Sequence, residues 1–61
     1  MSNITAKELS ALEDQLGYEN VLIKKYRAFA LQCTDTELQT KCNAIADKHQ
    51  HHYNTLMGYL K

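Results

Sequence analysis

The chain has 61 residues, no proline, two glycines, and seven basic against seven acidic side chains, so its formal net charge is zero. A chain of this length forms one small domain, and a balanced charge excludes the extended basic face that binds nucleic-acid phosphates. No apolar run approaches the roughly 18 residues of a membrane span, and the first residues lack the apolar core of a signal peptide. We therefore expect a cytoplasmic protein that contacts neither nucleic acid nor membrane.

The first predicted element is a helix over about residues 5–33. Thr5 and Glu8 fit the capping-box pattern, in which two side chains satisfy free amides at a helix start. Apolar or small residues then recur at alternating spacings of three and four, the pattern of a helix packed at a shallow angle. This seam consists of Leu9, Leu12, Leu16, Glu19, Ile23, Tyr26, Ala30 and Cys33. Glu19 is its one charged member.

A turn at about residues 34–35 and a second helix over about 36–60 follow. Thr34 and Glu37 repeat the capping-box pattern, with Asp35 as a competing cap. The predicted seam of the second helix consists of Leu38, Cys42, Ile45, His49, His52, Leu56 and Tyr59. Two histidines thus hold consecutive core positions. Gly58 weakens the last turn, so we expect fraying there.

The short connection forces the two helices antiparallel, which predicts an all-α, two-helix hairpin occupying residues 1–61 as a single domain. Counted from the turn, Glu19 faces the gap between His49 and His52. A buried polar group without a partner costs about 1–3 kcal/mol, so these three side chains should share one partner. A carboxylate and two imidazoles are common ligands of zinc and iron. We therefore predict a metal site at Glu19, His49 and His52; the alternative is a hydrogen-bonded network that only fixes the helix register.

Several other side chains have simpler expected roles. Cys33 and Cys42 lie nine residues apart across the turn and should not face each other, so we expect free, buried thiols. His51 points nearly opposite His49 on the helix and should be solvated, pairing with Asp47. Tyr26 should pack in the core or donate a hydrogen bond to the glutamate of the site.

Apolar residues outside the seam make the first helix too hydrophobic for one partner helix to cover. They are Tyr18, Val21, Leu22, Ala28, Phe29 and Leu31. A chain this short also buries only about 60% of its surface, so an isolated hairpin should be marginal. We expect two hairpins to pair about a two-fold axis into a four-helix bundle that holds one or two ions. Gly17 would permit close approach of a partner helix.

The layout resembles one half of a ferritin-like, rubrerythrin-type bundle. The resemblance rests on Glu19, on Tyr26 seven residues later, on Ala28-Phe-Ala30, on a short acidic turn, and on the ligand pair of the closing helix; it covers residues 8–60. The same layout is similar to the short spore coat F family. The resemblance implies a homodimeric bundle with a metal held in its core by the first-helix glutamate and the closing Glu-x-x-His.

In this resemblance the first-helix glutamate is matched by Glu19 and the closing histidine by His52, while His49 stands where the family has a glutamate. A symmetric pair of hairpins would then offer two carboxylates and four imidazoles, whereas the ferritin-like pattern offers four carboxylates and two imidazoles. This donor set departs from that of a di-iron oxidase and favours zinc, copper or a single iron.

Two functions from different classes follow. The first is a metal-binding, ferritin-like homodimer with redox or metal-sequestering activity, for which iron or zinc is the expected ion. The alternative is a structural spore-coat-type module without catalytic activity, located in the coat, that docks on other coat or helical proteins. The sequence has no nucleophile–base pair and no phosphate-binding glycine loop, so an enzyme that works without metal is not expected. Whether a metal site would turn over a substrate stays open.

Overall fold

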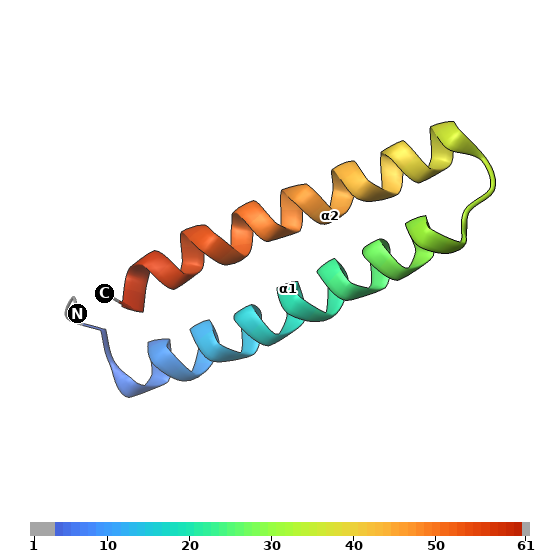
Figure 1. The fold of residues 1–61 in the computed structure, drawn as a ribbon. Helices are drawn as coiled ribbons and strands as arrows, with labels where there is room; N and C mark the ends of the chain where they lie inside the picture. The colour runs from blue at the N-terminus through green and yellow to red at the C-terminus, as the bar shows by residue number, and fades with distance from the viewer. Residues whose placement is uncertain (1–3, 61) are drawn as a thin grey trace.

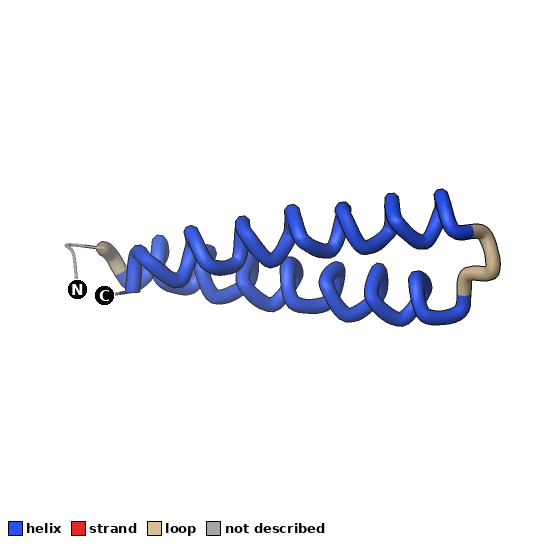
Figure 2. The backbone as a smooth tube through the Cα atoms, turned by 45° about the horizontal axis from the view of Figure 1, so that its top comes forward, coloured by secondary structure: helices blue, strands red, loops and turns tan. Residues whose placement is uncertain are grey.

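The protein, represented by a computed structural model that describes residues 4–60, is a hairpin of two antiparallel helices (Figure 1). Helix α1 spans Ala6–Gln32, α2 spans Thr36–Met57, and a short 3-10 turn, η1, covers Gly58–Leu60. Figure 2 shows the loop at one end, with the start of α1 and the end of α2 together at the other. The predicted all-α hairpin is confirmed. None of the described helices is long and apolar enough to cross a membrane.

The start of α1 is capped as the sequence predicts. The Thr5 hydroxyl accepts a hydrogen bond from the Glu8 N–H at 3.0 Å, and the Glu8 carboxylate accepts one from the Thr5 N–H at 2.9 Å. This reciprocal pair satisfies two amides that have no partner within the helix. The chain is therefore helical from Ala6, close to the predicted start.

The start of α2 uses only one of the two predicted caps. Asp35 is the N-cap, and its Oδ1 accepts a hydrogen bond from the Leu38 N–H at 3.0 Å. A second capping box built on Thr34 is therefore wrong. At the other end the helix changes from α to 3-10 at Gly58, where the sequence predicts fraying.

We expect Asp35→Ala to lower the free energy of unfolding by about 1 kcal/mol, because it removes the side-chain acceptor of this helix start. Thr34→Ala is the matched control, since Thr34 lies in the same loop and does not cap the helix. Urea denaturation followed by circular dichroism measures both. Equal losses in the two variants would contradict the assignment of Asp35 as the cap.

The seam of α1 faces α2 as predicted. Leu16, Glu19 and Ala30 are buried, and the other predicted members are partly buried. Gly17 is not needed for this packing, because nothing lies within 4 Å of the position its Cβ would take. The predicted approach of a partner helix at Gly17 stays a prediction.

The seam of α2 differs from the prediction at every second position. Cys42, His49 and Leu56 face α1 as expected, but Leu38, Ile45, His52 and Tyr59 are exposed. The residues that follow them in sequence take their places, so the observed seam is Gln39, Cys42, Ala46, His49, Tyr53, Leu56 and Leu60. Both seams alternate three and four and share three members. The prediction chose the more hydrophobic set, and it was wrong about the rotation of α2.

Polar contacts between the helices explain this rotation. The Gln39 side chain donates to the Ala30 carbonyl at 3.0 Å, satisfying an acceptor at the end of α1. Arg27 donates to the Asn43 carbonyl at 3.4 Å and to its Oδ1 at 3.3 Å. These contacts turn residues 39 and 43 toward α1. Ala46, which has no exposed surface, then allows the helices to pack closely.

Asp47 has a different partner from the one predicted. Its Oδ1 lies 2.6 Å from Nη2 of Arg27, so the predicted pairing with His51 is wrong. The Asp47 side chain is 70% exposed and that of Arg27 is 40% exposed, so solvent screens this ion pair and it adds little stability. Its main effect is to tie the two helices together along one side of the hairpin.

Candidate metal centre

The centre of the hairpin holds a buried carboxylate. Glu19 lies on the seam of α1 with only 6% of its surface exposed. Its Oε1 is 2.6 Å from Nδ1 of His49, which is 30 residues away in sequence, and the ring nitrogen donates a hydrogen bond to it. The register predicted from the turn brings these two side chains together.

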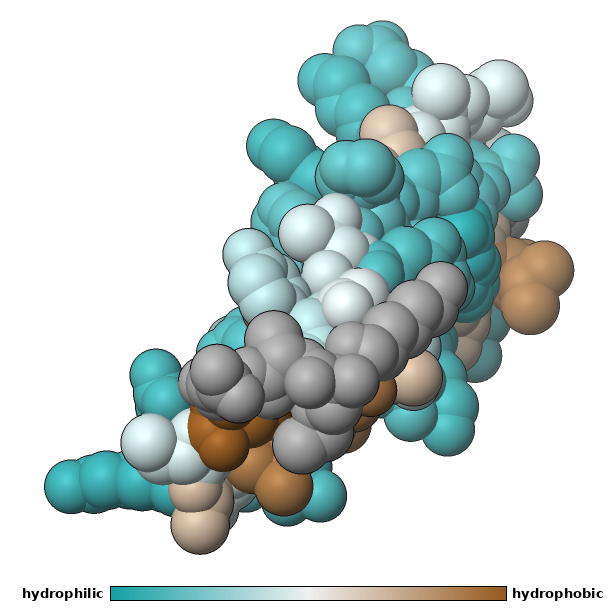
Figure 3. Space-filling view, turned by 90° about the vertical axis from the view of Figure 1, so that its left-hand side faces the viewer, coloured by the Kyte–Doolittle hydropathy of each residue, from teal (hydrophilic) through white to brown (hydrophobic). Residues whose placement is uncertain are grey.

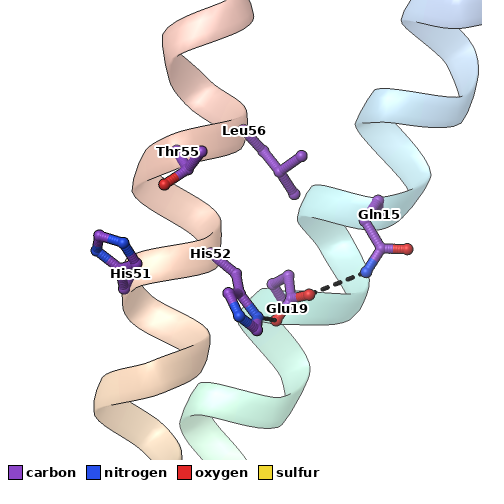
Figure 4. Close-up of a pocket in the computed structure, with 6 residues that line it drawn as sticks. All are labelled: Gln15, Glu19, His51, His52, Thr55 and Leu56. Atoms are coloured by element: carbon purple, nitrogen blue, oxygen red, sulfur yellow. Dashed lines mark hydrogen bonds and ion pairs between the residues drawn. The ribbon is translucent and has the colours of Figure 1, made fainter.

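His52 approaches the same oxygen from one side. Its Nδ1 is 3.7 Å from Oε1 of Glu19, but its side chain is 48% exposed. Figure 4 shows the His52 ring beside the carboxylate. The sequence predicts a core position for His52, and the structure places it at the rim because α2 is rotated. Even so, Glu19, His49 and His52 each offer a ligand atom within 4.8 Å of the others. The structure thus brings together the three predicted ligands.

Two further residues hold the site in place. Gln15, one turn before Glu19, donates from Nε2 to Oε2 of the carboxylate at 2.9 Å (Figure 4). The sequence analysis missed this residue, although an amide four positions from a carboxylate on a helix is a recognisable pair. The Tyr26 ring stacks on His49, with ring centres 6.2 Å apart and planes within 13°. Tyr26 therefore orients the imidazole through its ring; the hydrogen bond considered for its hydroxyl is not how it contacts the site.

The site opens into a groove of about 470 Å³ along one side of the hairpin. Its lining consists of Gln15, Glu19, His51, His52, Thr55 and Leu56. In Figure 4 the His51 ring points away from Glu19, which agrees with the prediction that this histidine is not a ligand. Water or a small molecule can reach the carboxylate and the exposed histidine through this groove.

The surroundings of Glu19 favour its charged form. The hydrogen bond from His49 holds the pKa of this carboxyl below its ordinary value, aided by the hydrogen bond from Gln15 and the nearby charge of both histidines. Burial acts in the opposite direction but does not prevail. A carboxylate that stays ionised is ready to bind a cation.

This lowered pKa predicts how stability depends on acidity. Because folding lowers the pKa of Glu19, its contribution is fully present above about pH 4.5 and is lost as the pH falls through the lower folded value. In the presence of a chelator, the melting temperature of the wild type should fall more steeply below pH 4.5 than that of Glu19→Gln. Both proteins retain Glu8, whose pKa is also lowered by its hydrogen bonds to Thr5, so the difference isolates Glu19. Parallel curves would contradict the prediction.

The distances also show what a bound metal would change. The 2.6 Å between Glu19 and His49 is that of a hydrogen bond. A tetrahedral zinc ion would hold its ligand atoms about 3.3 Å apart, so it would replace the shared proton and move the two groups slightly apart. Two histidines and one carboxylate leave coordination positions free, as in catalytic zinc sites and mononuclear iron sites.

The cysteines lie outside this centre. Cys33 and Cys42 are free thiols, as the sequence predicts; Cys42 is buried as expected, whereas Cys33 is only partly buried. Burial raises the pKa of Cys33, with smaller contributions from Cys42 and Asp35, so little of this thiol is in the reactive thiolate form. Within residues 4–60, only the glutamate and the two histidines form a cluster suited to a metal ion.

No family model, no curated protein and no solved structure matches this chain, so the resemblance to ferritin-like and spore coat proteins stays a prediction.

Proposed function

We propose that this protein binds a transition-metal ion, iron or zinc, through Glu19, His49 and His52, as part of a homodimeric ferritin-like four-helix bundle. The observation that supports it most is the meeting of one carboxylate and two imidazoles, from separate helices, within 4.8 Å at the centre of a hairpin. Every other level of the interface is lined mainly by apolar or small side chains. Placing three titratable groups together there is costly unless they share a task.

The donor set and the groove suggest what the ion would do. Three protein ligands leave positions for water or a small molecule, and the groove beside His52 gives access to them. Each hairpin contributes only one carboxylate, which suits a single ion per hairpin better than a carboxylate-bridged pair. We therefore propose metal sequestration in the cytoplasm as the basic activity, with redox chemistry where the ion is iron.

A second function has its own supporting observation. Both oxygens of the Glu19 carboxylate already accept hydrogen bonds, from His49 and from Gln15. Within residues 4–60 no buried side-chain nitrogen or oxygen lacks a partner. A satisfied network of this kind can fix helix register without any ion. Under this reading the protein is a structural module of the spore-coat type that docks on other helical proteins.

Elemental analysis and thermal melting of protein purified without a histidine tag distinguish the two functions. Metal binding predicts about one ion per chain and a fall in melting temperature when a chelator is added. At free metal 100-fold above Kd, the ion would add about 2.7 kcal/mol to the free energy of unfolding. A protein without ions, whose melting temperature does not respond to iron, zinc or chelator, would establish the structural function.

A further inference from the structure

The two broad sides of the hairpin differ in chemistry. Gln15 on α1 and His52 on α2 line the groove, which lies on one side of the hairpin. Residues seven or fourteen positions from either of them along the same helix lie on that side too. The six larger residues there define the apolar face: Leu22 and Phe29 on α1, and Leu38, Ile45, His52 and Tyr59 on α2. The opposite side carries the contacts of Arg27 with Asn43 and Asp47.

The apolar face is only partly covered by the hairpin itself. Phe29 is 53% exposed and Ile45 37%, and Leu38 and Tyr59 are also exposed. Seen from the end of the hairpin, the surface is mostly hydrophilic, with its hydrophobic atoms gathered in separate patches (Figure 3). Other exposed apolar residues, such as Val21 and Leu31, lie elsewhere on the hairpin, but Phe29, Leu38, Ile45 and Tyr59 are grouped on one side. A grouped patch of this kind marks a contact surface more than single exposed residues do.

Helix α2 carries two overlapping apolar stripes. The inner stripe packs on α1, and the outer one is the seam that the sequence predicts, of which the structure leaves Leu38, Ile45, His52 and Tyr59 exposed. The two share Cys42, His49 and Leu56. A stripe of this width is typical of a helix that contacts two neighbours in a bundle, one in its own hairpin and one beside it.

The hairpin by itself has little core. Its buried hydrophobic residues are Leu16, Ala30, Cys42 and Ala46, and among residues 4–60 no large side chain is fully buried. The Cα atoms extend 46 by 14 Å, and with side chains added this footprint is of the same order as the roughly 800 Å² per partner that a stable dimer needs.

We infer that a second copy of this chain packs its apolar face against this one and covers the groove of the metal centre. The six residues of the face carry no lysine, arginine, aspartate or glutamate, so these residues themselves bring no like charges together when two copies meet. Glu19 is the central residue of α1, with 13 residues of the helix on each side. A two-fold axis through the centre therefore sets Glu19 and His52 of the second copy at the same level, across the groove.

This inference identifies the surface and the occupant, and its metal part rests on the proposed function. Because the open side of the centre lies on the apolar face, pairing removes water from His52 and brings further ligands to the ion. Metal affinity should then depend on dimerisation, with monomeric variants binding about tenfold more weakly. Residues on other surfaces of the hairpin should affect neither property.

Sedimentation equilibrium of matched lysine variants tests the interface. Phe29→Lys and Ile45→Lys place a charge on the apolar face, whereas Val21→Lys and Leu31→Lys place it on exposed residues, 60% and 85% accessible, that lie off this face. The wild type and the two controls should have twice the 7.0 kDa mass of one chain, and the face variants should have the mass of one chain. Where a lysine variant loses its helical circular dichroism, Phe29→Ser and Ile45→Ser replace it.

Zinc titration of the same variants tests the coupling. The face variants should bind zinc about tenfold more weakly than the controls. A monomeric wild type, or controls that dissociate as readily as the face variants, would overturn the interface. Equal zinc affinity in monomer and dimer would overturn the coupling. A dimer that depends on the apolar face but binds no zinc or iron would refute the proposed function and leave the interface standing.

Discussion

The double variant His49→Ala/His52→Ala should lose metal binding completely, while His51→Ala should bind metal as the wild type does. The double variant leaves Glu19 as the only ligand of the cluster, and one carboxylate does not hold a transition ion against water. His51 lies between the two ligands in sequence but points away from the carboxylate (Figure 4). It therefore controls for the general affinity of histidines for metal.

Isothermal titration with zinc and iron, together with elemental analysis, measures this prediction. Circular dichroism must show that the double variant keeps its helices, since His49 also donates the hydrogen bond that supports the buried Glu19. Unchanged metal content in the double variant would refute the site. An equal loss in His51→Ala would show that the binding belongs to the surface histidines as a group.

Ala46→Leu should destabilise the hairpin more than any surface change. Ala46 has no exposed surface and lies one turn before His49, where the helices pack on a small side chain. The larger side chain has no room, so it must push the helices apart and lower the free energy of unfolding by about 1–3 kcal/mol. Such a loss is a large fraction of the stability of a domain this small.

The matched control is Ala44→Leu, which makes the same chemical change at an exposed position two residues away on α2. Urea denaturation should show a lowered midpoint for Ala46→Leu and little change for Ala44→Leu. Separation of the helices should also lengthen the contact between Glu19 and His49 and weaken zinc binding. A tolerated Ala46→Leu would mean that the helices are not tightly packed at this level.

The sequence by itself determined the helices, their direction and the level at which the site forms. The capping box at Thr5 and Glu8 marks the start of α1, and a connection of three residues leaves no choice but an antiparallel return. Once the direction is set, counting residues from the turn aligns Glu19 with His49. These features are local or follow from helix geometry, so the sequence contains them directly.

Only the tertiary structure decided how α2 is rotated, and with it which side chains are core and which are surface. Two sets of residues on α2 fit the same alternating spacing of three and four. They share every second member, and each of the other members of one set is followed in sequence by the matching member of the other set. Hydrophobicity favours the stripe with Leu38 and Ile45. Contacts across the interface select the other one, because Gln39 caps a carbonyl of α1 and Arg27 draws Asn43 inward. This rotation places His52 at the rim of the site, although the sequence predicts a core position for it. The apolar pattern of one helix does not show which of two neighbouring helices each apolar residue will contact.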